Sequence, residues 1–207
     1  PTKRNLKLIC LPTTSGTGSE VTQFSTVWDM RKKIKISLED DLMRPDYSIT
    51  DPVLSYTMPK IVTYSTALDA LNQCFDSYWN INANSITKKL AKKTIFKIIS
   101  GLKKIIINSR DKSARKILSY SSLQSGICIS KTRTSICHSF SYPLTMNYNI
   151  DHGYACAFTM LSVIKYVNLK NKNFFDHILR KNKKRKIKFD YFYNQLEHLM
   201  KKTNVKI

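Results

Sequence analysis

The sequence has few acidic residues, few glycines and no closely paired cysteines, and these shortages narrow the classes of protein it can represent. Its 14 Asp and Glu stand against 35 Lys and Arg, a formal net charge of +21. The five cysteines form no Cys-x-x-Cys pair and lie mostly in apolar segments, so we expect buried free thiols of a reducing compartment, the cytoplasm, and no disulfides. No apolar run approaches the ~20 residues of a membrane span, which argues against a membrane protein.

The excess of positive charge would suit a nucleic acid or an anionic membrane as a partner. The lysines are scattered along the whole chain, however, and come with many Ile, Asn and Tyr. The densest run, KNKKRKIK at 181–188, resembles a nuclear-localisation patch. We favour a solvated, lysine-rich surface for all of them. A basic nucleic-acid-binding protein stays open as an alternative, and it predicts one contiguous basic face.

The first sixty residues combine strand patterns with a glycine-containing loop. LKLICLP at 6–12 indicates a buried strand that runs into TTSGTGSE at 13–20, a loop of small hydroxyl residues and glycine. The β-branched stretches 21–29 and 32–38 suggest a hairpin. Three prolines follow, ending at Pro59, and they argue against long regular structure and place a domain boundary there.

Beyond Pro59 the apolar residues recur at helical spacing, with lysines on the opposite faces. Thr63, Ser65 or Thr66 is available as the N-cap of the first helix. Further helical patterns lie at 85–107, at 113–130, around His138, after Gly153 and from residue 173 onward. The expected fold is an α/β remnant over residues 1–60, which looks like a chain entered partway, followed by an all-α domain over residues 61–207.

Two positions on the first helix and two histidines raise the question of a metal site. Asp69 and Gln73 are four residues apart and so project from one helix face, and a carboxylate on an apolar face is costly unless something pairs it. His138 and His152 are two of only four histidines, but their spacing is no general metal motif. For each residue alone, a salt-bridged Asp or an ordinary packed histidine is the simpler interpretation.

In combination these residues resemble a known family. PTTSGTGSE, DYSITDP, TALDAL and the pair His138 and His152-Gly153 occur in the order and at the intervals typical of the iron-containing, group III alcohol dehydrogenases. The resemblance implies a dinucleotide-binding α/β domain followed by a helical domain, with Fe²⁺ or Zn²⁺ in the cleft and NAD(P)H as reductant. It also implies that this chain matches about the middle half of such an enzyme, without its pyrophosphate loop, and that homodimers are common.

Residue by residue, the resemblance assigns Asp69, His138 and His152 as metal ligands. Gln73 stands where the remaining histidine of the family would be, and its amide oxygen is a weaker ligand for iron or zinc than imidazole. We therefore expect a metal site of reduced affinity. Tyr142 stands where many members have a further histidine in a proton path, and it either relays a proton or simply packs there.

The same resemblance assigns a cofactor site. Thr13, Thr14, Thr22, Phe24 and Lys33 match positions that contact the dinucleotide in the family. The loop hydroxyls and glycines suit ribose and phosphate, although a loop of this composition without a ligand is the alternative for the octamer alone.

The residues before His138 suggest the substrate class. Lys131 and Arg133 flank Thr132 there, and such donors suit a small aldehyde with an anionic tail, unless both side chains point to solvent. FDSYWNINAN, TRT and HSFSYPLT resemble the phosphonoacetaldehyde reductase branch of the family. The leading hypothesis is reduction of phosphonoacetaldehyde, with succinic semialdehyde as the nearest rival substrate. A catalytically inactive remnant, motivated by Gln73 and the missing loop, is the alternative.

Overall fold

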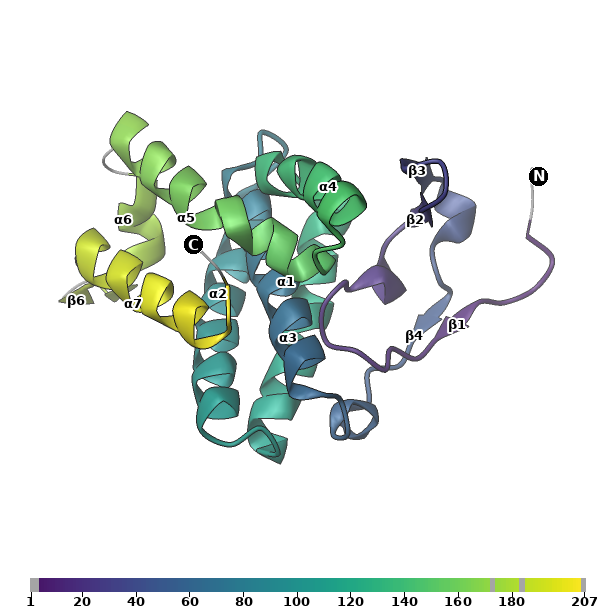
Figure 1. The fold of residues 1–207 in the computed structure, drawn as a ribbon, viewed down its shortest axis with the longest axis horizontal. Helices are drawn as coiled ribbons and strands as arrows, with labels where there is room; N and C mark the ends of the chain where they lie inside the picture. Colours follow the sequence, from purple (N-terminus) through teal and green to yellow (C-terminus); the bar gives the residue numbers. More distant parts are fainter. Residues whose placement is uncertain (1–3, 172–173, 183–184, 206–207) are drawn as a thin grey trace.

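The computed structural model describes residues 4–171, 174–182 and 185–205. Figure 1 shows a bundle of helices with the N-terminal strands and loops at one side of it. The helices are α1 (Lys60–Trp79), α2 (Ser85–Ile107), α3 (Lys112–Thr132), α4 (Ile136–Tyr148), α5 (His152–Lys170), α6 (Phe174–Leu179) and α7 (Phe189–Lys202). Among the described residues, no helix has the length and apolar character needed to cross a membrane.

The strands of the described residues form two-stranded sheets. β1 (Ile9–Cys10) pairs in parallel with β4 (Tyr47–Ser48), and β2 (Phe24–Asp29) pairs antiparallel with β3 (Ile34–Glu39). Three 3-10 helices accompany these strands: η1 (Ser19–Val21) follows β1, η2 (Asp41–Met43) follows β3, and η3 (Pro52–Ser55) lies between β4 and α1. The hairpin expected from the β-branched stretches is therefore present. The strand expected at 6–12 is shorter than predicted, and most of this stretch is exposed, so the prediction that it is buried is wrong.

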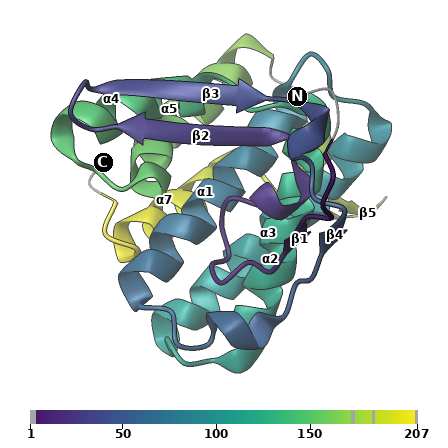
Figure 2. The ribbon, with the colours of Figure 1, turned by 90° about the vertical axis from the view of Figure 1, so that its right-hand side faces the viewer.

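Local hydrogen bonds close the turn of the β2–β3 hairpin. The Asp29 carboxylate accepts the N–H groups of Arg31 and Lys32 at 3.0 and 2.9 Å, and Lys33 takes a left-handed φ of 53°. Figure 2 shows the hairpin running across one end of the bundle. A ring contact between Trp28 of β2 and Tyr142 of α4, with centroids 6.1 Å apart, connects the two. The hairpin thus becomes one wall of the cavity described below.

The central helix is α1, which packs against α2, α3 and α5. Leu68, Leu71 and Phe75 on this helix are fully buried, and burial of each side chain contributes about 1.5–3 kcal/mol to folding. Because α1 is covered on nearly all sides, its polar residues are buried as well, among them Asp69, Gln73 and Asp76, and a buried polar group is costly unless it has a partner. The division of the chain at residue 60 stays a prediction.

The predicted N-cap of α1 is wrong. The helix begins at Lys60, Pro59 occupies the cap position, and no side chain caps it. Thr63, Ser65 and Thr66 all lie inside the first two turns. The carbonyl oxygen of Pro59 accepts both the N–H and the hydroxyl of Thr63, at 2.9 and 2.8 Å. Proline with its fixed φ starts the helix one turn before the first polar candidate.

The helix predicted from residue 173 onward is interrupted. A short antiparallel pair, β5 (Arg180–Asn182) and β6 (Arg185–Lys186), separates α6 from α7. Apart from Arg180, this pair falls within the basic run 181–188, of which residues 183–184 lie outside the described residues. Like charges at helical spacing repel one another, which disfavours a continuous helix there.

Candidate functional site

A cavity of about 830 Å³ lies between the β2–β3 hairpin and the helical bundle. Its walls include Trp28 and Lys35 from the hairpin, and Tyr142 from α4. Asp69 and His138 lie in the wall opposite the hairpin. The cavity therefore brings together segments that are more than a hundred residues apart in the sequence.

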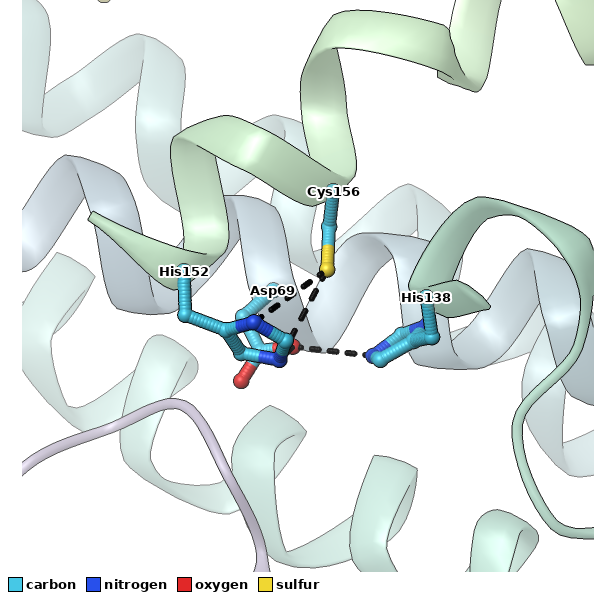
Figure 3. A group of neighbouring side chains, drawn as sticks. All are labelled: Asp69, His138, His152 and Cys156. Atoms are coloured by element: carbon cyan, nitrogen blue, oxygen red, sulfur yellow. Dashed lines mark hydrogen bonds and ion pairs between the residues drawn. The ribbon is translucent and has the colours of Figure 1, made fainter. Parts of the chain in front are cut away.

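Four candidate metal ligands converge beside this cavity. One ligand atom each from Asp69, His138, His152 and Cys156 lies within 4.8 Å of all the others. Figure 3 shows the four side chains pointing toward one another from α1, α4 and α5. Three of the four were predicted as ligands from the sequence, and Cys156 was not. The ligand assignments themselves stay predictions.

His138 is held at both ring nitrogens. Its Nε2 lies 3.2 Å from Asp69 Oδ1, and its Nδ1 lies 2.7 Å from Asp76 Oδ2. Burial would lower the pKa of His138, but Cys156 and the two carboxylates outweigh burial and raise that pKa well above its usual value. Asp76 is fully buried and also accepts the backbone N–H and hydroxyl of Ser135 at 2.9 and 2.6 Å. The ring orientation is therefore fixed by a dedicated carboxylate.

His152 opens α5 and depends on the glycine that follows it. A Cβ on Gly153 would lie 1.8 Å from the carbonyl oxygen of Ser65 in α1, so only glycine permits this approach. With the two helices in contact, His152 Nε2 lies 4.0 Å from Asp69 Oδ1. The ring also stacks on Tyr142 at an interplanar angle of 8°.

Asp69 carries the negative charge of the group. Burial raises the pKa of its carboxyl, but hydrogen bonds from His138 and Gln73 and the charge of both histidines outweigh burial, and the pKa is lower than usual. The carboxylate therefore remains ionised inside the bundle, in the state that binds a cation.

Gln73 lines the cavity next to this group but has other partners as well. Its amide nitrogen donates to the carbonyl oxygen of Thr17 at 3.2 Å, and its amide oxygen accepts the hydroxyl of Ser125 at 2.9 Å. The amide thus joins the glycine-containing loop to α1 and α3. Its predicted role as a ligand stays a prediction, and the structure gives its oxygen a hydrogen-bond donor instead.

Cys156 is the member of the group that sequence reasoning missed. Its Sγ lies 3.7 Å from Nε2 and 4.0 Å from Nδ1 of His152. Burial raises the pKa of this thiol, but the two histidines outweigh burial and lower it. The available signal was the spacing of four residues from His152, which places both side chains on one face of a helix. It was overlooked because all five cysteines were interpreted as packing residues.

Two of the five residues predicted to bind the cofactor line the cavity, and the other three do not. Thr22 and Phe24 line the cavity, whereas Thr13 and Thr14 are exposed in the loop before it. Lys33 is exposed at the hairpin turn. The lysine that the hairpin places in the cavity wall is Lys35, whose Nζ lies 3.3 Å from the centroid of the Tyr142 ring.

The predicted substrate cations also separate. Arg133 lines the cavity with a left-handed φ of 65° and forms an ion pair with Glu39 of β3 at 2.8 Å. Lys131 is exposed on α3 and is not part of the cavity wall. The pair Arg133–Glu39 joins the end of α3 to the hairpin across the cavity mouth.

Comparison with known proteins identifies the relatives of this chain. A family model described as "Fe-containing alcohol dehydrogenase family, C-terminal" matches residues 63–206, and one described as "Iron-containing alcohol dehydrogenase" matches residues 1–52. The phosphonoacetaldehyde reductase of Streptomyces viridochromogenes is 30% identical over 161 residues, 78% of this chain and 41% of that protein. The NADPH-dependent butanol dehydrogenase of Clostridium saccharobutylicum is 35% identical over 167 residues, 80% and 42% of the two chains.

A solved structure extends the likeness to the fold. The sulfoacetaldehyde reductase of Bifidobacterium kashiwanohense in complex with NAD⁺ superimposes with a TM-score of 0.86 at 26% identity, covering 98% of this chain and 54% of that one. The expected fold class is therefore confirmed. The chain spans about 40% of the length of the curated relatives described above.

Proposed function

Because the chain belongs to the iron-containing alcohol dehydrogenase family, we propose that it forms the metal site and one wall of the cofactor cleft of an NAD(P)H-dependent aldehyde reductase. The proposed substrate is a small anionic aldehyde, with phosphonoacetaldehyde first, and the proposed setting is a homodimer in the cytoplasm. The observation that carries the proposal is the convergence of Asp69, His138 and His152 beside the cavity that Arg133 also lines.

The donor set fits a divalent first-row metal ion. It offers a carboxylate oxygen, two imidazole nitrogens and a thiol sulfur within 4.8 Å of one another, and Asp69 and His138 are buried where water competes least. When bound, an Fe²⁺ or Zn²⁺ ion supplies Lewis-acid polarisation of a carbonyl oxygen, and NAD(P)H supplies the hydride.

The protein's own residues position the reactants and exclude water. Asp76 fixes the tautomer and the ring plane of His138, which keeps Nε2 directed at the metal position. Tyr142 and Trp28 form an aromatic wall around His152 on the hairpin side. Tyr142 carries a hydroxyl at this wall, and we assign it the delivery of a proton to the product alcohol.

Two cations of the cavity support an anionic substrate tail. Arg133 presents a guanidinium suited to a two-point grip on a phosphonate or carboxylate, and Lys35 adds a second positive charge from the facing strand. The pairing of Arg133 with Glu39 keeps the guanidinium at the cavity mouth. Two relatives carry names of reductases for aldehydes with a phosphonate or a sulfonate group.

The test compares three aldehydes by the rate of NAD(P)H oxidation with the purified, metal-loaded protein. We expect kcat/KM to fall in the order phosphonoacetaldehyde, succinic semialdehyde, butanal. Arg133→Gln is expected to raise KM for the phosphonate about tenfold or more, the loss of one charged hydrogen-bonding partner, and to leave butanal unchanged. Lys131→Gln, which alters an exposed cation off the cavity, is the matched control. Equal efficiency with butanal would refute the anionic substrate class.

Gln73 favours a second candidate, a catalytically inactive relative. In the family the corresponding position supplies a ligand, and here its amide oxygen accepts a hydrogen bond from Ser125. This candidate predicts no turnover with any of the three aldehydes while Asp69, His138 and His152 still bind metal. Measurable turnover that is lost in Asp69→Ala would rule it out.

A further inference from the structure

The site lacks one of the ligands that its family resemblance predicts. Gln73 takes the position of a histidine, and its amide groups contact Ser125 and Thr17. Asp69, His138 and His152 alone would leave a metal ion with three protein ligands. A fourth donor on another element would restore the number without any change at position 73.

Cys156 meets the geometric requirements for that donor. It lies one helical turn after His152 on α5, is fully buried, and has its Sγ 3.7 Å from His152 Nε2. In Figure 3 the sulfur points from α5 into the space between the two imidazoles, above Asp69. Cys74, Cys128 and Cys137 belong to the hydrophobic core cluster, whereas Cys156 faces polar groups that can share a metal ion.

We propose that Cys156 is the fourth protein ligand of the metal site and restores the number of ligands reduced by Gln73. The inference rests on the metal site of the proposed function. On binding, the Cys156 thiol loses its proton to solvent and a sulfur–metal bond forms, so one proton is released for each metal ion bound at this residue. The resulting set has two nitrogens, one oxygen and one sulfur.

The exchange of an imidazole for a thiolate changes the metal preference. Thiolate is a soft ligand that favours zinc, whereas a site of carboxylate and imidazole alone accommodates iron as well. We therefore assign this site a stronger preference for Zn²⁺ over Fe²⁺ than a site with three histidines and one aspartate has. Elemental analysis of the metal that the chain binds when the two ions compete measures this preference directly.

The decisive experiment replaces the native metal by Co²⁺ in the 207-residue chain and records its absorption spectrum. A cobalt–thiolate bond gives an intense charge-transfer band in the near ultraviolet, and cobalt in any protein site gives weaker d–d bands in the visible. Cys156→Ser is expected to lose the charge-transfer band and to weaken Zn²⁺ binding at least about tenfold. Cys128→Ser, which alters a buried cysteine next to Thr87 and outside the ligand group, is the matched control and is expected to retain both.

The outcomes test two questions separately: whether Cys156 is a ligand, and whether the chain has a metal site. Visible d–d bands without a charge-transfer band would overturn the role of Cys156 and leave the metal site intact. Failure of the chain to bind Co²⁺ at all would overturn the metal site of the proposed function and this inference with it. If Cys156→Ser does not fold, X-ray absorption at the zinc edge of the wild-type chain decides, with one sulfur neighbour at about 2.3 Å expected and none contradicting the proposal.

Discussion

The buried carboxylate of Asp76 shows how a residue that does not contact the cavity can govern the site. It receives hydrogen bonds from His138 Nδ1, from the backbone N–H of Ser135 and from the Ser135 hydroxyl. The Ser135 hydroxyl also accepts the indole N–H of Trp79 at 2.8 Å. These bonds place the first turn of α4 on α1 and orient the imidazole at the same time.

We predict that Asp76→Asn weakens metal binding by about 10- to 100-fold, because such orienting partners of a metal-bound histidine have effects of that size. The amide is nearly the same size as the carboxylate, so the fold should be retained. Isothermal titration with Zn²⁺ together with far-ultraviolet circular dichroism checks both statements. Asp111→Asn, at the N-cap of α3 where asparagine also caps well, is the control. Unchanged affinity in Asp76→Asn would show that His138 needs no carboxylate partner.

A second residue-scale prediction concerns Glu20 in η1, whose side chain is only 5% exposed. Burial raises the pKa of this carboxyl above its ordinary value of 4.5. Below pH 4.5 the group is protonated in both the folded and the unfolded state, and above the folded pKa the buried charge costs stability. Glu20→Gln should therefore raise the melting temperature at pH 7.5 and lose this advantage as the pH falls toward 4. An equal gain at both pH values would show that burial of charge is not the cause.

Residue identity alone predicted part of the site. Asp69, His138 and His152 could be singled out because their order along the chain resembles a family pattern. Asp76 could not, since its contact with His138 depends on how α4 packs on α1, whereas the spacing of four residues between His152 and Cys156 was an available signal that was not used. Lys33 was predicted to contact the cofactor, whereas the structure has Lys35 in the cavity wall and Lys33 exposed at the hairpin turn.

At the scale of elements, the contact between α1 and α5 depends on Gly153. We predict that Gly153→Ala destabilises the chain by about 1–3 kcal/mol, the usual cost of overpacking, because the added Cβ meets the Ser65 backbone. It should also weaken metal binding, since α5 carries His152. Gly101→Ala is the matched control, because its Cβ meets only side chains, those of Leu118 and Ile117, and no backbone, and because alanine improves helix propensity. Urea unfolding and Zn²⁺ titration measure both effects, and wild-type values in Gly153→Ala would contradict the prediction.

A second contact between elements is made by Arg115, which is 3% exposed on α3. Its guanidinium donates to the carbonyl oxygens of Ser55 and Met58 and to the hydroxyl of Thr63, each at 2.9 Å. These bonds attach η3 and the start of α1 to α3. They also provide donors for the carbonyl oxygens of Ser55 and Met58, just before the uncapped N-terminus of α1.

We predict that Arg115→Met costs about 3 kcal/mol of stability, because it leaves several buried acceptors without a donor. Arg110→Met, at an exposed position just before α3, should change stability by less than about 0.5 kcal/mol. The two variants are compared by their denaturation midpoints, provided that the dependence of the unfolding free energy on denaturant concentration is the same for both. Similar midpoints for both would mean that water replaces the guanidinium, which would contradict the structural role.

At the scale of the whole molecule, the helical part could be predicted more fully than the N-terminal part. Helical periodicity identified the segments around α2 and α3 because each helix buries one continuous face. The strands β1 and β4 consist of two residues each and pair across nearly forty positions, so no local pattern specifies their partners. The interruption between α6 and α7 lies in a lysine-rich segment, where repulsion between like charges disfavours a helix, and hydrophobic periodicity does not measure that repulsion.

The parallel pair β1–β4 exposes an apolar face. Ile9 is opposite Tyr47 in the register, so Ile9, Leu11, Tyr47 and Ile49 share one face, with exposed fractions between 49% and 58%. Parallel strands are normally covered on both faces, and a contiguous apolar surface of this kind binds other apolar surfaces. This face is therefore open to association with another apolar surface.

We predict that the 207-residue chain binds a hydrophobic fluorescent dye through this face. Ile9→Lys combined with Ile49→Lys should remove most of the fluorescence and lower the tendency to aggregate, because a charged side chain on an edge strand opposes further pairing. The control is Ile81→Lys, since Ile81 is 97% exposed but lies between α1 and α2, away from these strands. A charge there should leave dye binding unchanged. If all three proteins bind equally, the apolar surface responsible lies elsewhere, and the β1–β4 pair is stable in water without a cover.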